Sequence, residues 1–446
     1  MKGTKCMKNF FLKRTRLQLA SMGFLFVLLL SPTRIYLTGL FALDFSPSFM
    51  SDVLISVIDF LLVLFLGFVL YKNREKIKKP NLVALIMMGV VGFLMFQSLI
   101  TLIIVDDFEF KYFLSSISKL ARFSLMIWFI VSLIKFEILT FDDFEVILVI
   151  SLIILVIVSP VTMIIYEIYA LMGRAGTLGF PSNYLGVFGS VLFVYAFFSK
   201  KTLLRITSAI VGLTGAILSG SRRPLFFLVA FVVAYIIYEA IIIIRLFVRE
   251  KNNQGIRKYL ISMSAFIVFI LIFIILWNTS ALDFFKSLPL IRRVLDFLES
   301  GQSLIVDNAR FDIYKKVWNL IVQHPFGLGG SDAYLNVIYI AEGHAHNVFL
   351  QFALLYGWVW FAFFFELFIY YCIYFIKSII NFILKGQNVG IFNFYLMILI
   401  LYDFLDYNLY SSKMIYVFAM VFALVLMKYT NQKSLVNAVL NDESMS

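Results

Sequence analysis

The chain has 446 residues, of which 62% are hydrophobic and 14% charged, and its formal net charge is +12. A soluble globular domain has roughly 45–50% apolar and about 25% charged residues, so the composition excludes an ordinary soluble domain and indicates a membrane protein. The positive charge gathers between apolar runs, which relates it to membrane topology and argues against nucleic-acid binding. The two cysteines, Cys6 and Cys372, predict neither a disulfide framework nor a metal site.

Long apolar segments recur along the whole chain. Runs of this kind occupy residues 17–37, 52–71, 81–105, 113–134, 144–165, 183–199, 203–219, 224–247, 259–277, 347–376, 389–407 and 412–428. Because a helix needs about 20 mostly apolar residues to span a bilayer, the sequence predicts an all-α polytopic membrane protein with about 12 transmembrane helices. The first run lacks a small-residue cleavage site, so it predicts a retained anchor in place of a cleaved signal peptide.

The basic residues favour one side of this predicted topology. Most of the 38 lysines and arginines fall in alternate connecting segments, with dense groups at 72–80 and 245–258, whereas the opposite turn at 106–111 is acidic. Cytoplasmic loops are enriched in Lys and Arg, so both termini are expected in the cytoplasm. The predicted organisation is transmembrane helices one to nine in 1–277, a large outward-facing loop in 278–346, transmembrane helices ten to twelve in 347–428, and a cytoplasmic tail in 429–446.

The outward-facing loop contains two amphipathic segments, IRRVLDFLES (291–300) and NARFDIYKKVWNLIVQ (308–323). Their apolar residues recur at intervals of three and four, which is the spacing of neighbours on one face of a helix. The loop is therefore expected to form amphipathic helices that lie against the membrane surface.

Arginines, lysines and histidines gather in the segments predicted to face outward. Arginine donates bidentate hydrogen bonds that match phosphate oxygens, and histidine exchanges a proton near neutral pH. Such a face suits a lipid-linked phosphate leaving group and a hydroxyl nucleophile. Its members are Arg174, Arg222, Arg223, Arg292, Arg293, Arg310, Lys315, Lys316, His324, His344 and His346.

These residues also fit plainer interpretations. Arg222 and Arg223 have the position of interfacial arginines that extend to lipid head groups. Arg310 lies between two aspartates in sequence, which suits a structural ion pair, and His324 precedes a proline, which suits a turn. A metal is a further alternative for the pair His344 and His346, but shared ligation would require an extended segment, because residues two apart on a helix point in different directions.

A transporter is the alternative from a different functional class. Transport pathways are marked by ionisable residues inside the membrane. The predicted spans hold few central charges, chiefly Asp59, Glu239, Glu366 and Asp403. The unusual residues lie in outward loops, which favours chemistry at the membrane surface.

Three segments, in order, resemble the O-antigen ligase and polymerase superfamily of bacterial envelope glycosyltransferases. They are GRAGTLGFPSNYLG (173–186), SGSRRP (219–224), and a stretch that begins at Arg310 and continues through HPFGLGG (324–330) to HAHNVFLQFALLYGW (344–358). The chain departs from the family pattern at Arg223–Pro224, where a small residue often follows the Ser-Arg, and at Ser182, which replaces the usual proline before Asn183.

The resemblance implies a GT-C-like membrane fold and a metal-independent, cofactor-free glycosyl transfer with inversion at the anomeric carbon. It implies undecaprenyl-diphosphate-linked oligosaccharides as donor and acceptor, and places Arg222 and Arg310 on the diphosphate and His346 at the acceptor hydroxyl. The further substrate-binding residues expected from this comparison are Arg223, Arg174, His344 and Asn347.

We expect a polymerase of lipid-linked repeat units for O-antigen or capsule, at the outer face of the bacterial inner membrane. A ligase that transfers the finished polysaccharide to lipid A–core is the alternative, and a lipid-linked oligosaccharide flippase is a third. Expected partners are the lipid-linked substrates, membrane lipids and a chain-length regulator protein.

Overall fold

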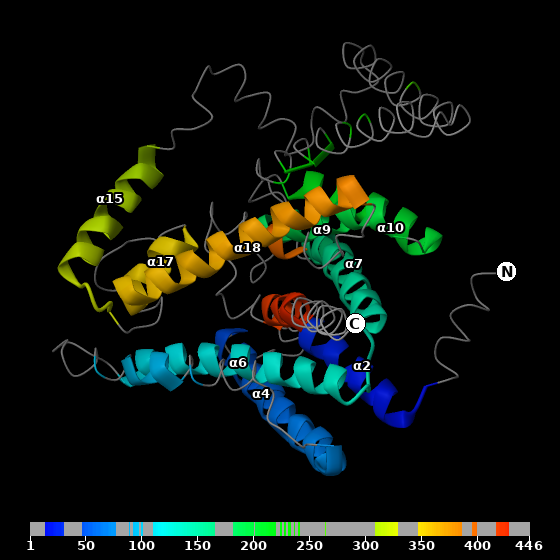
Figure 1. Ribbon diagram of the computed structural model, residues 1–446, viewed down its shortest axis with the longest axis horizontal. Helices are drawn as coiled ribbons and strands as arrows, with labels where there is room; N and C mark the ends of the chain where they lie inside the picture. Colours follow the sequence, from blue (N-terminus) through cyan, green and yellow to red (C-terminus); the bar gives the residue numbers. More distant parts are fainter. Residues whose placement is uncertain are drawn as a thin grey trace, which may run out of the picture. The chain divides into compact units, whose positions relative to one another are not determined.

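The computed structural model describes residues 14–30, 47–76, 92–97, 110–165, 182–199, 201–219, 308–328, 347–385, 395–398 and 416–427, with scattered residues between 89 and 264. In these parts of the chain, every regular element is a helix (Figure 1). The elements are α2 (Arg16–Leu30), α4 (Pro47–Lys72), the 3-10 helix η2 (Arg74–Lys76), α6 (Phe110–Lys135), α7 (Phe141–Ile165), α9 (Ser182–Phe198), α10 (Thr202–Leu218), α15 (Asn308–Gln323), α17 (Val348–Tyr356) and α18 (Trp358–Lys385).

The predicted all-α class is confirmed for the described residues. About twelve spanning helices were predicted from runs of roughly 20 apolar residues; among the residues that the structure describes, no helix is both long enough and apolar enough to cross a membrane. One predicted segment is wrong in its bounds: the run at 347–376 is two helices, α17 and α18, which are interrupted at Gly357, and the second continues to Lys385.

The chain packs as two compact units, each of which combines distant parts of the sequence. The first comprises Met1–Leu152, Leu304–Tyr371 and Phe392–Ser446, and the second comprises Ile153–Ser303 and Cys372–Ile391. The predicted boundaries of the outward loop and the cytoplasmic tail concern membrane topology, and they stay a prediction.

Aromatic side chains hold the helices of the first unit together. Phe24 of α2, Phe65 of α4 and Phe129 of α6 form a three-ring cluster with centroid separations of 5.0–5.9 Å. Edge-to-face and tilted arrangements of this kind add about 0.5–1.5 kcal/mol per pair beyond the burial of the rings. The cluster fixes α2 against α4 and α6.

A polar contact crosses the same bundle. Nε of Arg122 on α6 donates to Oδ2 of Asp59 on α4 at 2.6 Å, and the hydroxyl of Tyr416, in the helix at 416–427, donates to Oδ1 of the same carboxylate. The Arg122 and Asp59 side chains are only 14% and 23% exposed. Asp59, which the sequence singled out as a charge within a span, is therefore neutralised by neighbouring helices.

The second unit is centred on close packing of α9 against α10. A Cβ added at Gly189 would lie 2.6 Å from the carbonyl oxygen of Gly212, and one at Gly212 would lie 2.7 Å from that of Gly189. Small residues allow such backbone approach, which is the usual packing of helices in membranes. α10 ends at Leu218 and is capped at Ser219, the first residue of the SGSRRP motif.

Candidate functional site

Two turns from the motif-bearing part of the chain meet through their backbones. The first, at 324–328, follows α15, and the second separates α17 from α18 at Gly357. The amide of Trp358 donates to the carbonyl oxygen of Pro325 at 3.0 Å, and the amide of Leu328 donates to that of Leu354 at 2.8 Å. We call this contact the glycine junction, because each turn contains a glycine at the point of closest approach.

Only glycine fits at these two points. Gly327 and Gly357 have φ values of 82° and 84°, a region that other residues rarely adopt. A Cβ at Gly327 would lie 2.5 Å from the carbonyl oxygen of Leu355, and one at Gly357 would lie 2.5 Å from that of Pro325. Gly327 of HPFGLGG and Gly357 of LLYGW are therefore required by the contact between the two turns.

A side chain from the N-terminal half of the chain bridges the junction. Gln97 lies in the helical segment 92–97, and its Nε2 donates to the carbonyl oxygen of Phe326 at 3.0 Å and also to that of Tyr356. One amide group thus satisfies an acceptor from each turn. Because buried or half-buried carbonyls need partners, Gln97 stabilises the two turns together.

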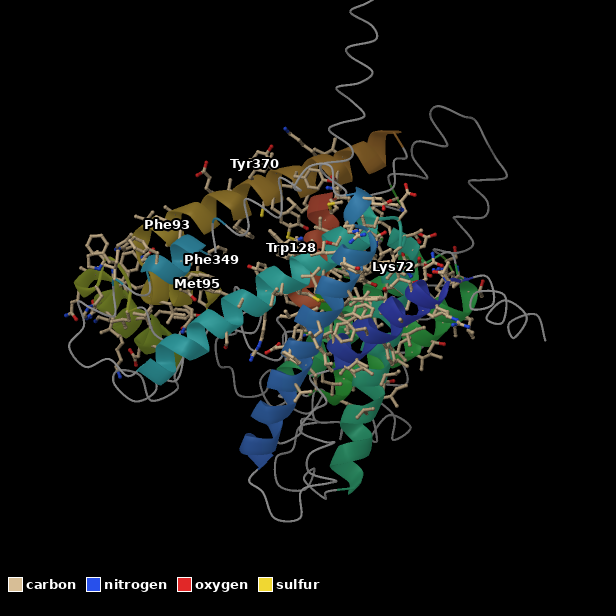
Figure 2. The ribbon with its side chains drawn as sticks, turned by 90° about the horizontal axis from the view of Figure 1, so that it is seen from below. Lys72, Phe93, Met95, Trp128, Phe349 and Tyr370 are labelled. Atoms are coloured by element: carbon tan, nitrogen blue, oxygen red, sulfur yellow. The ribbon has the colours of Figure 1, made fainter. Side chains whose placement is uncertain are left out.

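An apolar core lies beneath the junction and joins α15 to α17. Its buried members are Leu94, Leu120, Val317, Ile321, Leu328, Ala353, Leu354, Leu355 and Tyr356. Met95 and Phe349 pack against it from the outside, and Figure 2 shows both at the same end of this unit. Trp318 of α15 meets Trp358 of α18 edge to face at a centroid distance of 5.2 Å. α15, α17 and the start of α18 therefore form one packed scaffold.

The sequence explains why α17 begins at Val348. Asn347 has an extended backbone, with φ −151° and ψ 121°, and its Oδ1 accepts from the amides of Phe349 and Leu350 at 2.9 and 3.1 Å. Asparagine is among the best residues for this capping position. Asn347 was predicted to bind substrate; the structure gives it a capping role, and a substrate contact stays a prediction.

The predicted amphipathic helix at 308–323 is confirmed with the same bounds as α15. Val317 and Ile321 are buried against the core, whereas Lys315 and Lys316 are exposed. After Gln323 the chain turns at His324, whose carbonyl oxygen accepts from the amide of Gly327 at 2.9 Å. This agrees with the interpretation of His324 as a turn residue.

The predicted site residues are only partly within the described structure. Arg310 lies in the first turn of α15, although its side chain lies outside the description. His346 immediately precedes the cap of α17. The residues that lie wholly outside the described parts are Arg174, Arg222, Arg223, His344 and His346.

Two of the predicted site residues lie within or next in sequence to the helices of this scaffold. Arg310 is near the start of α15 and His346 is just before α17, and both helices end at the glycine junction. Because α15 and α17 pack through a shared core, a shift of either helix at the junction would also move its starting end. The junction therefore couples the positions of α15 and α17.

Two residues of the junction were not singled out from the sequence. Gln97 is separated from its two acceptors by 229 and 259 positions, and no local pattern distinguishes it from other polar residues in an apolar segment. Gly357 did carry a signal, since a glycine in the interior of an otherwise apolar helical run is unfavourable by about 1 kcal/mol and indicates a break.

One comparison with known proteins matches this same part of the chain. A search of curated proteins found no significant match. Residues 207–365 match the family described as O-Antigen ligase, a range that contains most of α10, all of α15 and α17, the 324–328 turn and the start of α18. This part of the chain is therefore similar to the superfamily of O-antigen ligases and polymerases, and the match does not separate the two activities.

Proposed function

We propose that the protein is an inner-membrane glycosyltransferase that polymerises undecaprenyl-diphosphate-linked oligosaccharide repeat units at the outer face of the membrane. The observation that carries the proposal is the family match across 207–365, because this range contains Arg222, Arg310 and His346. Arginine suits a diphosphate leaving group, and histidine suits the removal of a proton from a hydroxyl acceptor.

In the proposed reaction, the acceptor hydroxyl attacks the anomeric carbon of the donor sugar and the bond from that carbon to the diphosphate oxygen breaks. His346 takes the hydroxyl proton, an effect typically worth about 10²–10⁴-fold. Arg222 and Arg310 neutralise the charge that grows on the departing lipid diphosphate, so no metal ion is needed for this purpose. The configuration at the anomeric carbon inverts because attack and departure occur on opposite faces.

The scaffold around the glycine junction supports these roles. α17 has nine residues, and its amino-terminal end, next to His346, carries a partial positive charge that favours a nearby anion. Arg310 lies in a helix that is packed against α17. Catalytic groups need such support from packed elements, because small displacements of a reacting group lower the rate strongly.

A ligase that transfers the finished polysaccharide to lipid A–core is the second candidate, and the name of the matched family favours it. Both activities break the same bond to the carrier diphosphate, and they differ only in the acceptor. A ligase acceptor carries several phosphates, which would require a broader cationic surface than the polymerase acceptor does.

The test uses the purified full-length protein with lipid-diphosphate repeat units. A polymerase lengthens chains without added lipid A–core, whereas a ligase forms product only when lipid A–core is present. Absence of transfer in both formats would contradict the proposal and favour the transporter alternative.

The roles of the two histidines are tested in the same assay. His346→Ala should lower the rate at least as much as His344→Ala, and the reverse order would assign the base to His344. Transfer should continue in EDTA, and loss of activity that zinc restores would instead favour metal ligation by the His344–His346 pair.

A further inference from the structure

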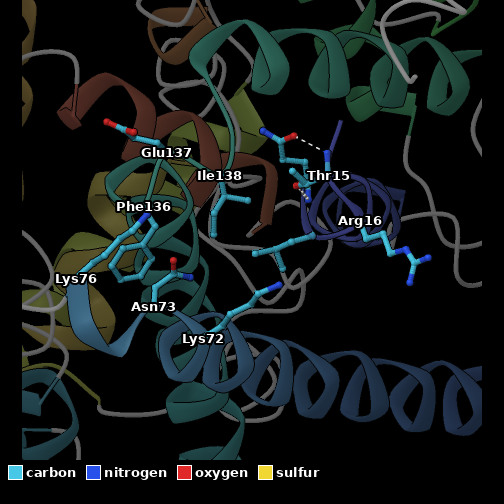
Figure 3. A pocket seen from close by; sticks show the side chains of 10 residues that line it. Thr15, Arg16, Lys72, Asn73, Lys76, Phe136, Glu137 and Ile138 are labelled. Atoms are coloured by element: carbon cyan, nitrogen blue, oxygen red, sulfur yellow. Dashed lines mark hydrogen bonds between the residues drawn. The ribbon is translucent and has the colours of Figure 1, made fainter. Parts of the chain in front are cut away.

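A second site is formed at the end of the first unit where α2 begins and α4 ends. An open cavity of about 320 Å³ lies between the first turn of α2, the residues after α4 and the turn between α6 and α7 (Figure 3). Small-molecule sites typically have volumes of about 300–1,000 Å³. The cavity is lined by Thr15, Arg16, Leu17, Gln18, Lys72, Asn73, Lys76, Phe136, Glu137 and Ile138.

The lining is cationic. Arg16, Lys72 and Lys76 contribute three positive charges and Glu137 one negative charge. Within the described residues, none of these three cations has a carboxylate partner, in contrast to Arg14, which forms an ion pair with Asp143 nearby. The cavity therefore carries an uncompensated positive charge that suits a phosphate group.

The start of α2 is fixed at the edge of the cavity by a local cap. Thr15 and Gln18 form a reciprocal cap, in which the amide of Gln18 donates to Oγ1 of Thr15 at 3.2 Å and the amide of Thr15 donates to Oε1 of Gln18 at 2.9 Å. This motif satisfies two of the four amides that a helix start leaves without intrahelical partners. Arg16 and Leu17, between the two capping residues, also line the cavity.

The floor of the cavity and its approach are apolar. Phe136 and Ile138 are buried at its base. Along α4, Phe60, Leu64 and Phe68 are 62%, 52% and 50% exposed, and they recur every four residues toward Lys72. Residues four apart share a helix face, so a surface of exposed apolar side chains leads to the cationic opening.

A free anion would contact only the cationic lining of the cavity. A lipid would contact both the cationic lining and the exposed apolar side chains of α4. Its phosphate would meet the cations, its glycerol would lie over the apolar floor, and an acyl chain would follow the exposed stripe of α4. Tyr71 and Arg74, whose guanidinium carbon lies 5.1 Å from the Tyr71 ring centre, mark the same end of α4 as a boundary between lipid and water. We propose that this cavity binds the phosphate head group of an anionic membrane lipid such as phosphatidylglycerol.

The cavity has a consistent place in the predicted topology. Its three lining segments fall in or next to 1–16, 72–80 and 135–143, which the charge distribution assigns to the cytoplasmic side. Basic pockets between helices on that side are suited to anionic lipid head groups. The site is therefore distinct from the outward-facing chemistry, and its test does not depend on the proposed transfer reaction.

The test measures lipid binding to the detergent-purified full-length protein by native mass spectrometry. Wild type is titrated with phosphatidylglycerol, with phosphatidylcholine of the same acyl chains, and with inorganic phosphate. We expect preferential binding of phosphatidylglycerol and a loss of about 10- to 30-fold in its affinity in the double variant Lys72→Gln/Lys76→Gln. The charge-conserving pair Lys72→Arg/Lys76→Arg should retain binding.

The matched control is Lys201→Gln/Arg205→Gln, which removes the same charge from two exposed positions at the start of α10 and should leave lipid binding unchanged. Three results would each overturn the proposal. They are equal binding of the two lipids by wild type, unchanged phosphatidylglycerol binding in Lys72→Gln/Lys76→Gln, and inorganic phosphate binding as tight as that of the lipid, which would assign the cavity to a free anion.

Discussion

Replacement of Gly357 by alanine tests whether the glycine junction supports the proposed site. Gly357 has φ 84° and ψ 178°, a combination that is essentially restricted to glycine. A Cβ at this position would lie 2.5 Å from the carbonyl oxygen of Pro325 and 2.6 Å from the carbonyl carbon of Phe326. Since real Cβ contacts are not this short, the turn at 324–328 must move away.

The expected cost follows from two terms. A non-glycine residue in this backbone region is unfavourable by about 1–3 kcal/mol. The oxygen that the new Cβ would displace is also the acceptor of the Trp358 amide, so a hydrogen bond of 3.0 Å, with a net value of about 0.5–1.5 kcal/mol, would be lost or lengthened. Together these terms predict a destabilisation of about 1.5–4.5 kcal/mol and a displaced scaffold.

The assay combines thermal unfolding of the purified protein with the rate of glycosyl transfer. The Trp318–Trp358 pair reports locally on the junction through its fluorescence, because its rings are 5.2 Å apart. Gly67→Ala is the matched control. Gly67 lies within α4, and an added Cβ there meets no atom within 4 Å. Alanine is also more stable than glycine in the interior of a helix. Gly357→Ala should lower both the unfolding midpoint and the rate, whereas Gly67→Ala should lower neither.

A Gly357→Ala protein as stable and as active as Gly67→Ala would refute the role of the junction. A Gly357→Ala protein that is destabilised but transfers at the wild-type rate would show that the junction contributes to stability and not to transfer. This result would contradict the positioning role of α15 and α17.

Two further predictions concern polar contacts of the first unit. Gln97→Leu removes the donor to both turns of the junction, so it should destabilise the protein by about 1–3 kcal/mol and lower kcat/KM, as measured by thermal unfolding and transfer kinetics; unchanged values would show that the bridge is dispensable. Burial alone would raise the pKa of Asp143, but hydrogen bonds from Arg14 and Thr140 and the charge of Arg14 together lower it below its ordinary 3.8. The ion pair therefore contributes its full stability at pH values above 3.8, and this contribution is lost as the pH falls through the lowered pKa. The difference in unfolding midpoint between wild type and Asp143→Asn should thus become smaller from pH 7 to pH 3. A constant difference would contradict the assignment of the ion pair.

The helices that the sequence predicted well are those with a clear pattern and a clear end. The segment at 308–323 has apolar residues at three- and four-residue intervals, and it ends before His324–Pro325, where proline disfavours a helical conformation of the preceding residue. The run at 203–219 became α10, Thr202–Leu218, which is capped at Ser219. Local signals were sufficient in both cases.

Features that depend on tertiary contact were not predictable in the same way. The run at 347–376 is apolar on both sides of Gly357, so average hydropathy hides the break. The role of Gln97 depends on two turns more than 200 positions away, and only folding brings them together. Asn347 was selected for its place in the motif, whereas its capping role follows from its extended backbone at the start of α17.

The central claim is that Arg222 and Arg310 hold the carrier diphosphate beside His346. The most direct measurement is the transfer rate of purified Arg222→Ala and Arg310→Ala proteins, with Arg205→Ala on α10 as the control for loss of an exposed arginine. The two site variants should insert normally, keep the wild-type unfolding midpoint and lose about 100- to 1,000-fold in rate, as expected when a donor to a developing negative charge is removed, while Arg205→Ala retains activity. A wild-type rate in either Arg222→Ala or Arg310→Ala would contradict the claim.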